Sequence, residues 1–221
     1  MAVLEGGVSA LLAGVAEENQ KALHATIKPI PFGALGHYRV AARFNLIAAQ
    51  AANSRLFSLR NTGTNLIVIT RLNIRWLQTA AHTAPIEDSL DCFKLTSFTV
   101  DDTTNTVTPT VSRKKTTMAA APGNVNIRNV TVAGAAAGMT GGTLTKDGSP
   151  WAQLPKFLIA AVPTASEVKA DWLDGLDDVN GTHPFVFAQN EGFEIENRVL
   201  LGAAAGSGVY VDLCYAEVTV Y

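Results

Sequence analysis

The chain has few charged side chains: Asp, Glu, Lys and Arg make up 16% of its 221 residues, against about 25% in an average soluble domain. Hydrophobic residues, many of them alanine, reach 48%. This composition fits either a subunit that buries surface in an oligomer or a generally alanine-rich protein. The net charge of -2 and the pI near 6.1 provide no positive field for phosphates. We interpret the only basic run, Arg113-Lys114-Lys115, as a solvated loop and expect no nucleic-acid partner.

Cysteine is scarce, and long apolar runs are absent. Cys92 and Cys214 are the only cysteines, too few and too far apart for a disulfide framework or a zinc site. We interpret both as small buried side chains, and a disulfide between them stays open. A membrane-spanning helix needs about 18 or more consecutive apolar residues. The sequence contains no such run, so we expect no membrane partner. The N-terminal segment lacks a basic start and already carries Glu5, which argues against a secretory signal peptide.

Motifs for catalysis and cofactor binding are also absent. The four histidines, at positions 24, 37, 82 and 183, show no paired spacing for a metal. Ser207 lies between two glycines, but a strand follows it rather than the helix of a nucleophile elbow. The glycine-rich segments at 134–142 and 202–208 lack the lysine and hydroxyl residue of a phosphate-binding loop. We therefore predict no enzyme, no catalytic residues, no cofactor and no metal.

One acidic stretch leaves an irregular cation site open. Its four aspartates could offer several oxygen ligands, as hard cations require; they are Asp171, Asp174, Asp177 and Asp178. The spacing misses the EF-hand pattern, because Phe187 stands where the bidentate glutamate should be. The favoured interpretation of residues 166–179 is an acidic loop or a single helical turn around Trp172.

Alternating apolar and polar residues predict strands at both ends of the main domain. From His37 to Phe44 the alternation gives one buried and one exposed face. From Val209 to Tyr221 it continues to the last residue, but its phase flips past Ala216. The flip indicates either a bulge or a strand whose end leaves its own sheet.

Between these ends, segments 55–60 and 65–77 flank the turn residues Asn61-Thr62-Gly63-Thr64 and predict a hairpin. Further strands are predicted at 93–100, 107–111, 125–132 and 157–162. Long loops are predicted at 101–123 and 133–150, where surface loops could meet partners. The count of strands predicts an all-β, jelly-roll-like two-sheet sandwich over residues 37–221.

Residues 1–36 form a separate predicted part. Apolar residues recur at helical spacing from Ser9 to Leu23 and predict a short amphipathic helix. An extended arm is predicted from Ile27 to Gly33, because Pro29 and Pro31 disfavour helix. The helix could dock on a neighbouring subunit or on its own sandwich.

Three segments resemble those of tailed-bacteriophage and prophage proteins: ALHATIKPIPFGALGHYRVAA (22–42), AANSRLFSLRNTGTN (51–65) and HPFVFAQNEGFEIEN (183–197). The shared sequence motifs are "LGxY", "AANxxxFSxR" and "AQNEGF". The resemblance covers both ends of the chain and is weak in the middle. It implies a virion structural protein that forms β-sandwich oligomers on the capsid or in the tail, and it carries over no functional residues.

These observations together predict a bacteriophage virion protein, assembled in the bacterial cytoplasm, that decorates the capsid as a homotrimer or other homo-oligomer. The expected partners are copies of itself and other virion proteins such as the major capsid protein. The residues expected at subunit contacts are Leu12, Val15, Val218, Val220 and Tyr221. A tail, neck or baseplate component is the first alternative. A carbohydrate-binding sandwich for cell-surface attachment is the second, and a small hydrolase comes last.

Overall fold

The computed structural model describes residues 3–6, 11–14, 36–114, 124–161, 167–174, 185–204 and 206–219. The chain divides into two units, Met1–Pro31 and Phe32–Tyr221. In the first unit, β1 (Val3–Gly6) pairs antiparallel with β2 (Leu11–Gly14).

The helix predicted from Ser9 to Leu23 is not found at residues 11–14, which form β2. Its other residues lie outside the described ranges, as does the predicted arm from Ile27 to Gly33. Gly14 gives a physical reason, because glycine in a helix interior costs about 1 kcal/mol relative to alanine. The apolar segment instead pairs with the short strand that precedes it.

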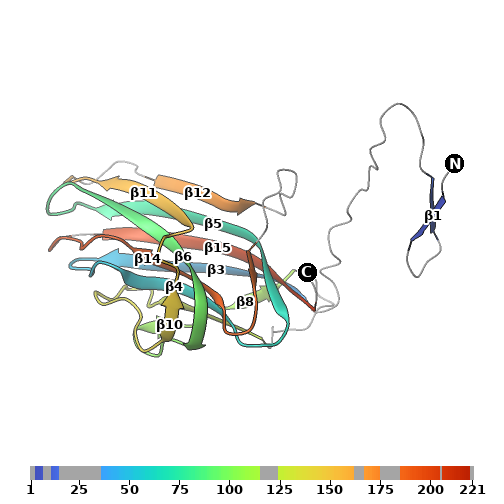
Figure 1. Cartoon of the computed structure of the whole chain (residues 1–221). Coiled ribbons are helices and arrows are strands. Elements are labelled where there is room, and N and C mark those ends of the chain that lie inside the picture. Colours follow the sequence, from blue (N-terminus) through green and yellow to red (C-terminus); the bar gives the residue numbers. More distant parts are fainter. Residues whose placement is uncertain are drawn as a thin grey trace. The chain divides into compact units, whose positions relative to one another are not determined.

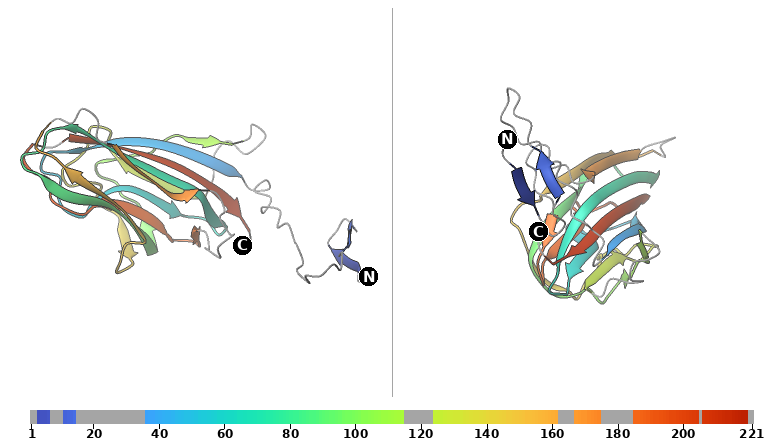
Figure 2. Two further views of the ribbon diagram at one scale, coloured as in Figure 1. Left: turned by 90° about the horizontal axis from the view of Figure 1, so that it is seen from above. Right: turned by 90° about the vertical axis from the view of Figure 1, so that its right-hand side faces the viewer.

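The second unit contains two antiparallel sheets that lie face to face (Figures 1 and 2). The six-stranded sheet runs in the order β12 (Glu167–Asp174), β5 (Leu66–Ala80), β15 (Gly206–Val218), β3 (His37–Ile47) and β8 (Val111–Arg113), and β13 (Phe185–Phe187) also pairs with β5. The seven-stranded sheet runs in the order β10 (Thr143–Lys146), β6 (Ile86–Val100), β14 (Gly192–Asn197), β4 (Ser54–Asn61), β9 (Val125–Val130) and β7 (Thr106–Val107), and β11 (Ala152–Leu158) also pairs with β6. The described part of the chain is therefore all-β, as predicted, and contains no helix.

The pairing of strands along the chain is nested. β3, the first strand of the second unit, pairs with β15, the last one. Moving inward along the chain, β4 pairs with β14, β5 pairs with β12 and β13, and β6 pairs with β10 and β11. Each sheet therefore takes strands from both halves of the chain. The short strands β7, β8 and β10 lie within the loops predicted at 101–123 and 133–150.

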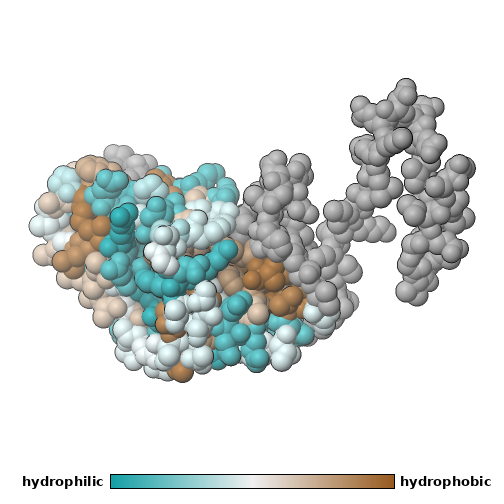
Figure 3. Space-filling model, in the orientation of Figure 1, coloured by the Kyte–Doolittle hydropathy of each residue, from teal (hydrophilic) through white to brown (hydrophobic). Residues whose placement is uncertain are grey.

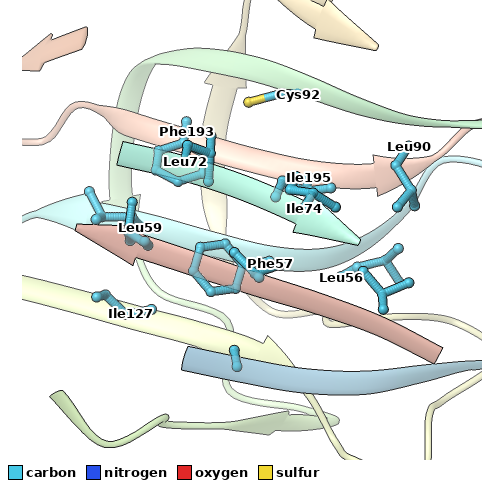
Figure 4. Packing of buried hydrophobic residues seen from close by; sticks show 14 of the residues in the cluster. Leu56, Phe57, Leu59, Leu72, Ile74, Leu90, Cys92, Ile127, Phe193 and Ile195 are labelled. Atoms are coloured by element: carbon cyan, nitrogen blue, oxygen red, sulfur yellow. The ribbon is translucent and has the colours of Figure 1, made fainter. Parts of the chain in front are cut away.

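Apolar side chains from both sheets fill the space between them. Tyr38, Val40 and Phe44 are fully buried on one face of β3, as the alternation predicts. Figure 4 shows Leu72 of the six-stranded sheet and Phe193 of the seven-stranded sheet in one cluster. Each such side chain contributes about 1.5 to 3 kcal/mol when it is removed from water.

The predicted hairpin between segments 55–60 and 65–77 is wrong. These segments belong to β4 and β5, which lie in opposite sheets, so the intervening loop crosses from one sheet to the other. Asn61 stabilises the crossing. Its Nδ2 donates to the carbonyl oxygens of Asn65 at 2.7 Å and Phe187 at 3.0 Å, and its Oδ1 accepts from the Gly63 N–H at 3.0 Å.

Two other segments differ from their predicted form. The stretch from 166 to 179 contains the edge strand β12 rather than a loop or helical turn, and Asp171 accepts a hydrogen bond from Asn73 of β5. The strand predicted at 157–162 lies earlier, because β11 ends at Leu158. The strand predicted at 93–100 is confirmed as part of β6, and the one predicted at 125–132 is β9, which ends at Val130. The strand predicted at 107–111 is not continuous, because β7 ends at Val107 and β8 begins at Val111.

The phase change near Ala216 does not come from a bulge in β15. Every residue from Leu213 to Val218 is buried, so both faces of the strand are covered near its end. β15 pairs with β3 in unbroken register, but against β5 the register jumps, so that Thr70 is an extra residue opposite the step from Cys214 to Tyr215. The bulge therefore lies in β5. β15 stays paired with β5 through Val218, so up to that residue the strand does not leave its sheet.

Candidate assembly surface

Five loops of the second unit meet at one end of its two sheets. β3 and β5 end there and β15 begins there, because Gly206 lies opposite both Ile47 and Ala80. β6 begins and β11 ends at the same end, where Ile86 pairs with Leu158. We give the name alanine platform to five segments of these loops: residues 47–53, 79–86, 131–138, 159–161 and 199–204. The exposed Arg198 borders the last segment.

The alanine platform carries no Lys, Arg, Asp or Glu in any of its five segments. Its two largest exposed apolar side chains are Val132, 55% exposed, and Leu200, 59% exposed. Small apolar residues surround them at the surface: Ala49, Ala51, Ala52, Ala84, Pro85, Ala133, Ala136, Ala137, Ala160, Ala161, Ala203 and Ala204. Figure 3 shows hydrophobic residues at the left end of the second unit and a second hydrophobic patch farther right, beside the grey atoms, with a hydrophilic region between them.

Backbone hydrogen bonds join the five loops to one another. The Ala49 N–H donates to the Gly202 carbonyl at 2.9 Å, and the Ala51 N–H donates to the Ala136 carbonyl at 2.7 Å. Two further bonds join the other loops: the His82 N–H donates to the Ile159 carbonyl at 3.1 Å, and the Thr83 N–H donates to the Ala204 carbonyl at 2.9 Å. The alanine platform is thus one connected surface rather than five separate loops.

Three buried amide side chains hold the platform from beneath. Gln50 donates through Nε2 to the Ala135 carbonyl at 2.8 Å, and Gln78 donates through Nε2 to the Ile159 carbonyl at 2.8 Å. Asn197 donates through Nδ2 to the Ala51 carbonyl at 3.0 Å and to the Val199 carbonyl at 2.8 Å. These bonds satisfy loop carbonyls from the inside, so the platform needs few polar side chains on its outer surface.

Two buried titratable groups lie beneath the platform. Asp88 Oδ1 accepts from the N–H groups of Ser89, Arg198 and Val199 at 2.8, 3.2 and 2.9 Å. Burial nevertheless raises the pKa of Asp88 to about 6. Burial lowers the pKa of His82, which favours its neutral form. Neither group reaches the outer surface, because Asp88 and His82 are both buried.

The predicted contact residues lie elsewhere or outside the described ranges. Leu12 lies in β2, opposite Glu5. Val218 lies at the end of β15 remote from the platform, opposite Leu66, and only 6% of it is exposed. Val15, Val220 and Tyr221 are not among the described residues. A contact role for these five residues stays a prediction.

Sequence reasoning missed the alanine platform because it treated alanine as a matter of overall composition. The positions of the alanines could have indicated the surface, because uncharged segments that contain alanine recur where predicted strands end. The structure is needed to bring them together, since strand order decides which loops share an end.

No family model matches the chain, and no curated protein matches it. No helix long and apolar enough to cross a membrane occurs in the described segments. Within those same segments no group of three or more His, Cys, Asp or Glu residues could hold a metal ion.

Proposed function

We propose that the chain is a structural subunit that assembles with copies of itself through the alanine platform, as a bacteriophage capsid decoration protein. The observation that carries the proposal is the uncharged, hydrogen-bonded platform at one end of the sandwich. Contiguous apolar surface on a soluble protein marks an interaction site, because its burial removes it from water. Small side chains let a partner approach closely with little loss of side-chain entropy.

The two ends of the second unit differ in a way that favours one assembling end. The opposite end carries the exposed charged residues Arg113 and Lys114 and the half-buried Glu191. Such side chains keep their surface in water. The alanine platform has no such side chain, so it can be buried in a contact without removing a charge from water.

The nested strand pairing supports a jelly-roll. In that arrangement the first strand pairs with the last, the second with the last but one, and so on inward. Viral capsid domains are among the proteins that use jelly-rolls, but the same fold serves many functions, so this support is an analogy of fold. The virion context itself rests on the three segments that resemble tailed-bacteriophage proteins.

Light scattering coupled to size-exclusion chromatography tests assembly. We expect the wild type to elute as a defined homo-oligomer. Leu200→Asp places a carboxylate in the contact and should raise the dissociation constant by about 100-fold or more. Val100→Asp is the matched control, because Val100 is also exposed, at 46%, but lies at the far end of β6. A monomeric wild type at high concentration, or an equal effect of both variants, would contradict the assembly proposal.

Labelling of purified particles with antibody tests the location. Label distributed over the capsid shell is the expected result. Label confined to the tail, neck or baseplate would favour the alternative virion position. Absence of the protein from particles would remove both virion assignments while leaving self-assembly to be judged by light scattering.

A further inference from the structure

A polar groove lies on the outer face of the six-stranded sheet, away from the alanine platform. It has a volume of about 570 Å³ and crosses four neighbouring strands, β12, β5, β15 and β3. Pockets of about 300 to 1,000 Å³ are typical of sites for small ligands. Because the residues come from the middle of paired strands, the sheet holds them in fixed positions.

Strand register arranges the groove residues in rows of alternating charge. Lys169, Arg75 and Tyr210 lie side by side in one row, since Arg75 pairs with both of the others. The next row contains Asn73 and Asp212, which also pair. A third row returns to cationic side chains with Arg71 and Arg39, which flank Cys214.

Ion pairs leave positive charge in excess on this face. Asp212 accepts from Arg39 Nε and Nη2, each at 2.8 Å, and its Oδ2 lies 3.8 Å from Arg71 Nη2. Arg75 Nη1 lies 3.3 Å from Glu167 Oε1. Lys169 forms no ion pair with a residue of the described ranges. Two carboxylates therefore face four cationic side chains in the lining of the groove, and Asp171, which accepts a hydrogen bond from Asn73, adds a third carboxylate at its border.

Tyr210 adds an exposed aromatic ring to this charged surface. Tyr210 is 38% exposed, and the Arg43 guanidinium lies 5.4 Å from the centroid of its ring. Ala41 lies next to Asp212 in the sheet. Its small side chain leaves open space beside the Tyr210 ring. A planar aromatic ring beside hydrogen-bonding side chains suits the apolar face of a sugar ring.

We propose that this groove binds an acidic oligosaccharide. Arginine and lysine would bind its carboxylates, and arginine can do so with two parallel hydrogen bonds. Tyr210 would stack against a sugar ring, and oxygen atoms of Asn73, Asp212 and Glu167 would accept hydrogen bonds from hydroxyl groups. The carboxylates of the groove argue against an acidic peptide. Consecutive glutamate side chains would be repelled by Asp212 and Glu167, and they carry no hydroxyl group that could donate a hydrogen bond to these carboxylates.

Calorimetric titration of the full chain with hexagalacturonate tests the inference. We expect measurable binding, and weaker or no binding of the neutral maltohexaose. Tyr210→Ala and Arg75→Ala should each weaken binding about tenfold or more. Arg198→Ala is the control, because it removes an exposed arginine outside the groove and should leave the affinity unchanged. Circular dichroism establishes that each variant is folded.

Several results would overturn the inference. They are no binding of hexagalacturonate by the wild type, equal binding of maltohexaose, and binding unchanged by Tyr210→Ala or weakened equally by Arg198→Ala. Tighter binding of hexaglutamate than of hexagalacturonate would identify an acidic protein surface as the ligand instead. The inference does not depend on the proposed assembly, since the titration is informative for a monomer or an oligomer.

Discussion

Asp88 is a buried carboxylate whose ionisation works against the folded state. Its Oδ1 accepts three backbone hydrogen bonds, but its Oδ2 has no hydrogen-bond partner among the described residues. Burial raises its pKa from 3.8 to about 6. The protonated form is therefore favoured on folding, and the stability it contributes is full below about pH 4 and is lost as the pH rises through about 6.

Replacement of Asp88 by asparagine should raise stability near neutral pH. Asparagine keeps the Oδ1 acceptor but cannot ionise, so we expect Asp88→Asn to match the wild type at about pH 4. At about pH 7 its free energy of unfolding should be about 1 to 3 kcal/mol higher than that of the wild type. Urea unfolding at the two pH values and at equal protein concentration measures the difference. A variant destabilised more at about pH 7 than at about pH 4 would show that the charged form is the stabilising one.

Burial is the residue property that the sequence predicts best. Cys92 and Cys214 are free and buried, as expected, and they lie in different sheets. Alternation on β3 is confirmed residue by residue. Asp88 could not have been singled out, because its three backbone donors include Arg198 and Val199, which only the pairing of β14 with β6 brings near.

At the scale of elements, the turn before β14 explains why the motif AQNEGF contains a glycine, Gly192. Asn190 has a φ of 62°, and its N–H donates to the Asn61 carbonyl at 2.7 Å. Gly192 follows between β4 and β6. A Cβ on Gly192 would overlap the carbonyl oxygen of Leu59, which is backbone and is fixed in the sheet.

Gly192→Ala should therefore destabilise the chain strongly. We expect a loss of about 2 kcal/mol or more, because the added atom forces β4 and β14 apart. Gly148→Ala is the control: a Cβ there meets nothing within 4 Å, so its effect should be about zero or slightly stabilising. Thermal denaturation followed by circular dichroism compares the two. Equal melting temperatures would contradict the close approach at Gly192.

Strand identity was predictable, but strand partnership was not. The apolar faces of β4 and β5 fit a hairpin within one sheet and a connection between two sheets equally well. A four-residue loop can make either connection. Their actual neighbours, β14 and β15, come from the end of the chain. The apolar residues past Ala216 were interpreted as a bulge or a departing strand for the same reason, because alternation alone does not show that both faces of β15 are covered there.

At the scale of the whole molecule, two surfaces of opposite chemistry lie on different parts of the second unit. The alanine platform occupies one end and carries no charged residue. The groove occupies the outer face of the six-stranded sheet and is lined by charged side chains. An apolar contact and an ionic one respond differently to salt, because mobile ions screen charges but strengthen apolar association or leave it unchanged.

Salt should therefore separate the two activities in one preparation. Between about 50 mM and about 1 M NaCl the Debye length falls severalfold, to about 3 Å. We expect the oligomer to keep its mass over this range in sedimentation velocity runs, whereas the affinity for hexagalacturonate should fall by about tenfold or more. Dissociation of the oligomer at high salt would mean that charged surfaces outside the alanine platform hold the subunits together. Salt-insensitive binding of the saccharide would mean that the arginines and Lys169 do not contribute to its recognition.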